Sequence, residues 1–516
     1  MKQFTAPAKP ETLTCDLCII GAGAAGLNAL FVAAQYLKPD ARVVLIDRRD
    51  EPGGMWTDVY DFCRLHQPHP AFTVGNMDWS LSRPTHYLAT GTEVATHLRQ
   101  CLAKIEASVN LEVLFGHNVV RCEEGEAERG AMARIECEPV DGTEDLRIIE
   151  AKQVVKAIGF DVPTPEPLPL SSPSVVSTTP RNLAWESSDA APVFIVGGGK
   201  TGMDTAHAMI TRSPGRAVSL INGKGTVFVR RETFFPSGSR RWWDGQMIAT
   251  FFRDMALRFD GSNEDEIFAH MSRNFTVTVP GSAENFFFGI LSEEERDTIA
   301  NGLNDIHNDY LTDVVDGQGG PEMVMRSGKR HAVPAGSVFV NCTGHLVRHS
   351  HAYEPYLSKS GAVLSITPRS LPHFLSTMSA YFLSHLFFSG KLAETPLYEL
   401  DCEEIMKKGN RIYHTALMSL SFLNMLIMLR ALPFKVFDQC GLDIDRLYPL
   451  HRRAVALLDL KLNSKRYIAH CRAALDRVRD RTGVRCGPLD YGTSPAETSN
   501  EMISNHELLR YMAAAE

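Results

Sequence analysis

The chain has 516 residues, of which 44% are hydrophobic and 22% are charged, and its formal net charge is −8. This length predicts two to four domains, and the composition is typical of a soluble globular protein with a sizeable core. The negative net charge argues against a general nucleic-acid-binding protein, which normally carries a basic face. The 11 cysteines are scattered along the chain, so we expect no disulfide framework and a cytoplasmic location.

Neither the N-terminus nor the most apolar stretch predicts a membrane-inserted segment. Residues 1–13 contain no apolar core of signal-peptide length. The most apolar stretch, residues 415–428, has 14 residues and is too short to span a bilayer. We therefore expect no transmembrane span and a buried helix over this stretch. A surface that contacts a membrane, or that lines a route for an apolar substrate, stays open.

The first recognisable unit is a strand, a Gly-rich turn, a helix and a second strand. An apolar run over residues 16–20 precedes the turn, and a second apolar run, residues 43–46, ends at Asp47. The turn has three glycines in a GxGxxG pattern, Gly21, Gly23 and Gly26. Such glycines permit a tight turn, close approach of a pyrophosphate and close helix packing, and the helix N-terminus attracts the phosphates. Asp47 stands where a carboxylate accepts hydrogen bonds from ribose hydroxyls.

The same order of elements recurs between residues 193 and 221. The second turn contains Gly197, Gly199, Lys200, Thr201 and Gly202. The residue 20 positions after Gly202 is Asn222 instead of a carboxylate, and Arg230 and Arg231 follow. A neutral amide beside cations accepts the 2′-phosphate that a carboxylate would repel. We therefore predict NADPH at this unit, held by Lys200 and the two arginines. An ordinary solvated basic cluster is the alternative.

A third motif, Gly53, Gly54 and Trp56, follows the first unit in a GGxW pattern. The order GxGxxG, acidic residue, GGxW, linker and GxGxxGxD, ending at Asp204, resembles the flavin-containing and Baeyer–Villiger monooxygenases, which are class B flavoprotein monooxygenases. This resemblance covers roughly residues 14–400. It implies FAD in the first unit, with Gly53 and Gly54 close to the flavin and Trp56 packed nearby; a core Trp after a turn is the alternative.

The resemblance also points to a polar side chain that reaches the flavin ring or the nicotinamide. By position this is Gln67, with His66 as the second candidate. His66 and His69 are spaced like metal ligands, but no third ligand is evident, so we expect no metal.

Two further segments match the family loosely, and one family feature is missing. Residues 154–159 and 338–344 look like the segments where the family's chain crosses between domains, which would bring Thr343 and Gly344 to the cofactor. The family fingerprint F-x-G-x-x-x-H does not occur before the second turn, where residues 175–180 read VVSTTP. In the family that fingerprint is tied to control of oxygenation, so its absence keeps open an oxidase or electron-transfer reductase without oxygenation.

These observations predict an α/β fold with two Rossmann-like dinucleotide-binding domains, for FAD and NADPH, and a helical C-terminal extension. The expected parts are an FAD-binding domain over 1–180, an NADPH-binding domain over 190–340 with a helical insert at about 232–330, a second part of the FAD-binding domain over 341–400 and a helical extension over 401–516. A proline-rich linker covers 161–192. In the insert, Ser292 and Glu295 form a capping-box pattern that starts a helix. Aromatic residues of the insert, among them Trp242, Trp243 and residues 286–288, could line a substrate pocket or pack in the core.

The resemblance implies that NADPH reduces the flavin, that reduced flavin reacts with O₂ and that a C4a-peroxyflavin inserts one oxygen atom into a small organic substrate. A disulfide reductase would need a redox Cys pair beside the flavin, but the one CxxC pair, Cys15 and Cys18, precedes the first phosphate turn. A flavoprotein that only binds its cofactor is a further alternative. The C-terminal helices could form a lid, a homodimer contact or a membrane-surface contact.

Overall fold

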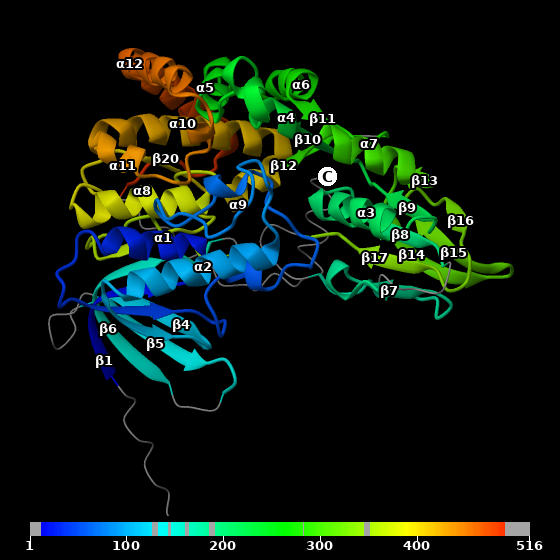
Figure 1. The fold of residues 1–516 in the computed structure, drawn as a ribbon, viewed down its shortest axis with the longest axis horizontal. Helices are drawn as coiled ribbons and strands as arrows, with labels where there is room; N and C mark the ends of the chain where they lie inside the picture. The colour runs from blue at the N-terminus through cyan, green and yellow to red at the C-terminus, as the bar shows by residue number, and fades with distance from the viewer. Residues whose placement is uncertain are drawn as a thin grey trace, which may run out of the picture.

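The computed structural model describes residues 12–125, 133–142, 146–159, 165–184, 191–281, 283–344 and 351–490 (Figure 1). Parts of the predicted linker, residues 161–164 and 185–190, lie outside the described residues, as do both chain ends and the side chain of Phe287.

The first sheet contains the first predicted unit at its centre. Its seven strands run in the order β3-β2-β1-β6-β5-β4, and β18 pairs with the end of β6. The strands are β1 (Thr12–Ile20), β2 (Arg42–Ile46), β3 (Asn110–Leu114), β4 (His117–Glu124), β5 (Ala133–Pro139), β6 (Arg147–Lys156) and β18 (Val363–Ser365). Strands β1, β2, β3, β6 and β18 are parallel, whereas β4 and β5 pair antiparallel. The helices beside it are α1 (Ala24–Ala33), α2 (Gly91–Glu106) and α8 (Ser376–Phe388).

The second sheet contains the second predicted unit and is parallel throughout. Its order is β13-β9-β8-β17-β7. The strands are β7 (Val176–Thr178), β8 (Val193–Val196), β9 (Val218–Ile221), β13 (Asp305–His307) and β17 (Val338–Asn341), and the helices are α3 (Lys200–Arg212) and α7 (Glu293–Gly302). Two Rossmann-like sheets in one chain confirm the predicted fold class.

The insert at about 232–330 is helical in its first part and again over α7 (Glu293–Gly302), but strands occupy much of the rest, so the prediction of a helical insert was wrong for those strands. The helices are α4 (Arg231–Phe234), α5 (Ile248–Arg258) and α6 (Glu264–Asn274), after which β11 (Thr276–Val277) and β12 (Asn285–Leu291) pair with β10 (Thr226–Arg230). Strand β13 then rejoins the second sheet, and β14 (Leu311–Gly317), β15 (Gly320–Met325) and β16 (Arg330–Ala332) form an antiparallel sheet. Side chains of β15 alternate between buried and partly exposed, the period-two pattern of a strand. The capping box of Ser292 and Glu295 is confirmed at the start of α7.

A helical layer covers the first sheet and its helices (Figure 1). It combines α5 and α6 with the C-terminal helices, which are α9 (Cys402–Lys408), α10 (Asn410–Ala431), α11 (Phe434–Asp438) and α12 (Leu450–Thr482). One hydrophobic cluster runs from β1 and α1 through α8 into α10 and α12. The helical C-terminal extension is thus confirmed over the described residues to 490, apart from β20 (Cys486–Pro488), which pairs with β19 (Tyr398–Leu400).

Helix α10 is longer than the apolar stretch in the sequence suggested. It has 22 residues, which with its apolarity would be enough to cross a membrane, but 89% of its most apolar 18-residue window is buried inside the protein. The expectation of a buried helix is confirmed, whereas the expectation that the helix is too short to span a bilayer was wrong. Asn424 explains how a polar residue fits: its side chain accepts from the Tyr398 amide at 2.9 Å and donates to Pro372 O at 2.6 Å.

Candidate functional site

The first Gly-rich turn joins β1 to α1 and has no room for side chains at two positions. Gly21 has φ +106°, and a Cβ there would lie 2.7 Å from Ala157 O. A Cβ on Gly26 would lie 1.8 Å from Gly21 O. The turn and the start of the helix therefore pack backbone to backbone, which is the reason such motifs need glycine.

The second turn, between β8 and α3, repeats this geometry. Gly197 has φ +120°, and a Cβ on Gly202 would lie 2.0 Å from Gly197 O. A Cβ on Gly197 would meet Cys342 C at 2.9 Å and Thr343 N at 3.1 Å. The first turn meets Ala157 at the end of β6 in the same way. The structure thus brings predicted Thr343, followed by Gly344, to the second turn.

The helices after both turns begin without a side-chain cap. Gly23 and Gly199 are the N-cap residues of α1 and α3, and neither start has a capping side-chain hydrogen bond, whereas Thr90 caps α2 and Ser292 caps α7. A Cβ built on Gly199 meets nothing within 4 Å. Amides at an uncapped helix start with open space before them suit a phosphate group.

Asp47 lies at the end of β2 and contacts the first turn, as its sequence position predicts. Its Oδ2 accepts from the Ala22 amide at 2.6 Å, and its Oδ1 accepts from the Arg49 amide at 2.8 Å. The equivalent Asn222 follows β9, and its Oδ1 lies 2.1 Å from the position of a Cβ on Gly198. Both residues therefore border their Gly-rich turn at equivalent places, one with a carboxylate and one with an amide.

The Gly53–Gly54 segment packs directly on the first turn. A Cβ on Gly54, which has φ +60°, would lie 2.9 Å from Gly23 Cα, and the Gly53 amide donates to Ala22 O at 3.0 Å. Trp56 follows in the short helix η1 (Gly54–Thr57) and packs edge-on against Phe72, with ring centroids 5.5 Å apart. The structure therefore brings the GGxW motif against the first Gly-rich turn.

A carboxylate on α3 joins the second turn to the first domain. Lys200 Nζ is paired with Asp204 Oδ1, and Asp204 Oδ2 accepts from the Tyr60 hydroxyl at 2.9 Å. The sequence marked Asp204 as the end of GxGxxGxD, but no local signal pointed to Tyr60, because the two residues meet only through the tertiary fold.

A second junction runs through the two predicted arginines. Arg231 pairs with Glu295 at 2.9 Å, and its Nε donates to His66 O at 3.4 Å. Arg230 lies 3.7 Å from a carboxylate oxygen of Glu293 and donates to Thr276 O at 3.5 Å. Each predicted cation therefore faces a carboxylate, so a phosphate would have to share these charges.

Burial and nearby charges determine the protonation states of Glu295 and His66 at this junction. Burial would raise the pKa of Glu295, but Arg231, Lys200 and the Ser292 amide hold it down to about 2. Burial lowers the pKa of His66 to about 3, and Lys200 and Arg231 act in the same direction. Glu295 is therefore ionised and His66 neutral near pH 7.

A cavity of about 290 Å³ lies between the first domain and α3. Its wall includes Leu65, Leu88, Lys200, Asp204, Arg231 and Glu295. Predicted His66 and Gln67, both half-buried, follow directly after Leu65. The structure thus brings the loop that carries them to the second turn.

His69 has a different place. It is buried, its Nδ1 lies 3.1 Å from Tyr87 O, and its ring packs edge-on against Trp79. Within the described residues, no group of three His, Cys, Asp or Glu side chains could hold a metal ion.

Two unpredicted residues lie near Gly223, which directly follows Asn222. A Cβ on Gly223 would lie 2.7 Å from Tyr310 Cε1, and the Arg326 guanidinium stacks 3.9 Å from the centre of the Tyr310 ring. Arg326 is exposed. It lies about 100 positions beyond Asn222, so sequence spacing could not have found it.

The aromatic residues of the insert separate into two places. Phe286 and Phe288 pack against His414 of α10, with centroids 5.0 and 4.8 Å apart, and Phe288 also packs against Phe374. Phe288 has φ +56° at a bulge, next to Gly289, whose Cβ would lie 3.6 Å from Lys200 Cβ. The structure therefore brings this cluster close to the second turn. Trp242 and Trp243 are instead exposed, so the expectation that they line a pocket or pack in the core was wrong.

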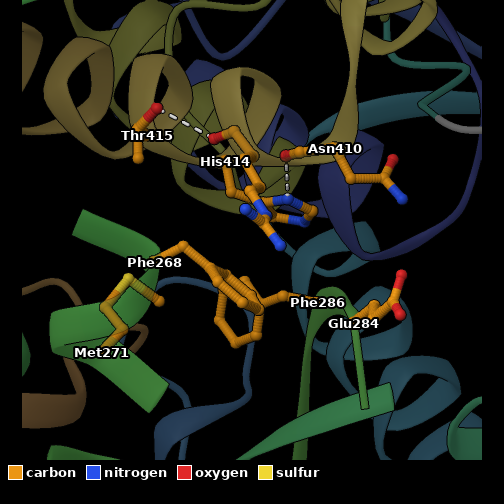
Figure 2. Close-up of a pocket in the computed structure, with 8 residues that line it drawn as sticks. Phe268, Met271, Glu284, Phe286, Asn410, His414 and Thr415 are labelled. Atoms are coloured by element: carbon orange, nitrogen blue, oxygen red, sulfur yellow. Dashed lines mark hydrogen bonds between the residues drawn. The ribbon is translucent and has the colours of Figure 1, made fainter. Parts of the chain in front are cut away.

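Behind the aromatic cluster lies a small cavity of about 10 Å³ (Figure 2). Figure 2 shows Phe268 and Met271 from α6 and Phe286 from β12 below His414 of α10. His414 Nδ1 lies 2.6 Å from Asn410 O, and burial lowers its pKa to about 3. The cavity has room for about one water molecule, so it is a packing gap and not a substrate site.

Residues 15–234 match the family model described as pyridine nucleotide-disulphide oxidoreductase. This region, which contains both predicted strand–turn–helix–strand units, is similar to that oxidoreductase family, and the match covers less than half of the chain. It also agrees with the resemblance to two-domain flavoenzymes.

Curated relatives match over part of their length. An uncharacterized protein of Mycobacterium tuberculosis is 32% identical over 207 residues, which are 38% of this chain and 36% of the relative. The L-ornithine N(5)-oxygenase of Arthrobotrys oligospora is 27% identical over 249 residues, 43% of this chain and 48% of the relative. The chain thus spans between about a third and a half of these relatives.

Solved structures are similar at lower identity. A flavin-containing monooxygenase from Stenotrophomonas maltophilia is 15% identical with a TM-score of 0.43, covering 74% of this chain and 99% of that chain. Cyclohexanone monooxygenase in a closed form is 14% identical with a TM-score of 0.47, covering 78% of this chain and 90% of that chain.

Proposed function

We propose that this protein is an FAD- and NADPH-dependent monooxygenase that inserts one oxygen atom from O₂ into a small organic substrate. The observation that carries the proposal is the pair of Gly-rich turns, each with an uncapped helix start, joined across the domains by Tyr60–Asp204 and His66–Arg231. When bound, FAD supplies hydride acceptance and oxygen activation, and the protein supplies binding and orientation.

The first turn would hold the FAD pyrophosphate, and Asp47 would accept from its ribose. The Asp47 oxygens already accept backbone amides, but each carboxylate oxygen has two lone pairs and can accept again. Gly54 packs on Gly23 and leaves only backbone at this point, so the cofactor can approach closely.

His66 and Gln67 would orient the rings by hydrogen bonds. A neutral imidazole has one N–H donor and one acceptor, and the amide of Gln67 also offers both. Because its pKa is about 3, His66 is neutral near pH 7 and is too weak a base to take up a proton. We therefore assign this loop an orienting role instead of acid–base chemistry.

The second turn would hold NADPH in preference to NADH. Asn222 borders the turn without a negative charge, and Arg326 lies on Tyr310 beside the next residue. A guanidinium pairs well with a 2′-phosphate, which NADH lacks. Lys200, Arg230 and Arg231 would complete the positive side of this site.

The relatives and the cysteines favour oxygenation over disulfide reduction. A relative that matches 43% of this chain is an oxygenase. Cys15 and Cys18 are buried in β1, and burial raises the pKa of Cys15 to about 12, which suppresses the reactive thiolate. All 11 cysteines are free, which supports our proposal of a cytoplasmic location.

An oxidase or electron-transfer reductase is the second candidate, and one observation favours it. Where the family fingerprint would stand, residues 176–178 form β7, the edge strand of the second sheet. The chain has a plain strand there, without the residues tied to oxygenation control.

The test is reduction of the purified protein by NADPH, followed by exposure to O₂ with panels of amines, thioethers and ketones. A monooxygenase would transfer ¹⁸O from ¹⁸O₂ to one panel member and release less hydrogen peroxide in its presence. One peroxide per NADPH with every compound would support the oxidase. A protein that takes up no FAD and leaves NADPH unoxidised would exclude both.

A further inference from the structure

The outward face of α12 is apolar over about two turns. Leu450, Val455, Leu458 and Leu462 are exposed large hydrophobic residues, and the spacing of the last three puts them on one side of the helix. In Figure 1, α12 lies at the outer edge of the helical layer. Monomeric proteins rarely leave such a stripe in contact with water.

Two exposed tryptophans belong to the same surface. They end the short helix η4 (Gly238–Trp242), where Trp242 stacks on His451 with ring centroids 5.6 Å apart. The Arg452 guanidinium fastens this segment to the start of α12, donating to Arg241 O at 3.1 Å and Gly245 O at 2.8 Å. We call the combined surface the docking face: Trp242, Trp243, Leu450, Val455, Leu458 and Leu462, each between 49% and 81% exposed.

Basic residues accompany the docking face. Lys461, Lys465 and Arg466 are exposed on the same side of α12. Residues 450–472 contain six Lys or Arg and one acidic residue, Asp459, which pairs with Arg253 at 2.8 Å. Asp244, beside Trp243, is paired with Arg240 at 3.1 Å. The surface is therefore positive in a chain whose net charge is −8.

We propose that the docking face binds the surface of an anionic lipid bilayer. Tryptophan and leucine side chains enter the boundary between headgroups and acyl chains, while lysine and arginine attract anionic headgroups. Because the buried helix α10 is committed to the core, this contact is peripheral.

Charge disfavours a second copy of the chain as the occupant. In an antiparallel pair of α12 helices centred on Leu458, Lys465 would face the His451–Arg453 segment of the other copy. In a parallel pair, the lysines would face each other. Either arrangement brings cations together without an exposed acidic residue from residues 450–472 to balance them, which costs affinity.

The experiment is co-sedimentation of the full-length protein with vesicles of phosphatidylcholine, alone or with phosphatidylserine. We expect binding to the anionic vesicles that weakens at high salt. Trp243→Ser with Leu458→Ser should lower the partition coefficient about tenfold by removing apolar insertion. Lys461→Gln, Lys465→Gln and Arg466→Gln together should lower it tenfold or more. Val140→Ser, at an exposed apolar position on the turn after β5, is the matched control and should bind like the parent.

Sedimentation velocity separates the alternatives. A concentration-dependent dimer that Leu458→Ser dissociates, without vesicle binding, would overturn the proposal in favour of self-association. Equal binding to neutral and anionic vesicles, or none to either, would also overturn it. NADPH oxidation by each variant, measured without vesicles, shows that the enzyme is folded.

Discussion

The Tyr60 hydroxyl donates to Asp204 Oδ2 at 2.9 Å and joins two residues that lie 144 positions apart in the chain. Tyr60 belongs to the loop after the GGxW motif, whereas Asp204 is the fifth residue of α3. Burial and the Asp204 charge raise the pKa of Tyr60 far above its usual value, so the hydroxyl stays protonated and keeps donating. Together with the Arg231–His66 contact, this hydrogen bond holds the two Gly-rich turns relative to each other.

Tyr60→Phe should weaken this junction without disturbing either turn. The lost hydrogen bond to a carboxylate should lower the free energy of unfolding by about 1–3 kcal/mol. Anaerobic reduction of bound FAD by NADPH should slow severalfold, because misplacement of the two rings lowers the hydride-transfer rate. Denaturant unfolding and stopped-flow absorbance measure the two effects.

Tyr87→Phe is the matched control. Tyr87 also donates to a carboxylate, Glu93, at 2.9 Å, but both residues belong to the first domain. This variant should lose stability and keep the rate of flavin reduction. If Tyr60→Phe reduced its flavin at the parent rate, the contact would have no part in aligning the cofactors.

Replacing the last glycine of one Gly-rich turn should impair the cofactor site of that turn and leave the other site intact. Gly26→Ala would put a Cβ 1.8 Å from Gly21 O, and Gly202→Ala would put one 2.0 Å from Gly197 O. Since only backbone could move, each turn must distort. The purified Gly26→Ala variant should retain little FAD, whereas Gly202→Ala should stay yellow but react with NADPH at least tenfold more slowly.

Gly319→Ala serves as the control, because a Cβ there meets nothing within 4 Å. It should leave both FAD content and NADPH turnover unchanged. Loss of FAD from Gly202→Ala at normal stability would contradict the assignment of the two turns.

Short sequence patterns predicted the features that depend on contacts between residues close together in the chain. The glycines of both turns are required by contacts made within about ten residues or with the neighbouring strand, so a strand–turn–helix pattern identified them. The Ser292–Glu295 cap was predictable for the same reason. The helix over 410–431 was underestimated because its polar residues are satisfied by tertiary partners, as Asn424 is by Tyr398 and Pro372.

Contacts between segments that are far apart in the chain could not be predicted from the sequence. Tyr60 and Arg326 reach the site from loops whose position depends on the whole fold. The strands β11 to β15 were missed, because the whole segment from about 232 to 330 was predicted to be a helical insert. Trp242 and Trp243 were expected to be enclosed because aromatic side chains usually are. Both are exposed, because their segment packs at the start of α12 on the protein surface.

Coenzyme preference should depend on Asn222 and Arg326. Asn222→Asp would add a carboxylate beside the second turn and repel a 2′-phosphate, so kcat/KM for NADPH should fall on the order of tenfold to a hundredfold. Arg326→Ala should raise KM for NADPH and leave NADH kinetics unchanged. The ratio of kcat/KM for the two coenzymes measures both effects.

Arg330→Ala is a suitable comparison, since Arg330 is exposed and pairs with Glu322 on β15 at 3.1 Å. It should not alter the ratio. An Asn222→Asp variant that kept its NADPH preference would mean that the 2′-phosphate binds elsewhere.

Stability should depend on pH through Glu295. Its pKa is about 2 in the folded protein and 4.5 ordinarily, so folding favours the ionised form. This stabilisation is therefore fully present well above pH 4.5 and is lost as the pH falls from about 5 toward 2. A shift of this size corresponds to about 3 kcal/mol. Glu295→Gln should therefore be less stable than the parent at pH 7, with the difference shrinking toward pH 2.

Glu293→Gln provides the comparison on the same helix turn. Glu293 is half-exposed and lies 3.7 Å from Arg230, so its ion pair is screened by water and its loss should change stability by less than about 1 kcal/mol at any pH. Because Arg231 is largely buried, Glu295→Gln leaves its charge without the carboxylate at 2.9 Å, which adds to the loss at neutral pH. Denaturant unfolding at pH 3, 5 and 7 measures both variants. A parallel pH dependence for Glu295→Gln and the parent would show that another group, not Glu295, controls acid stability at the junction.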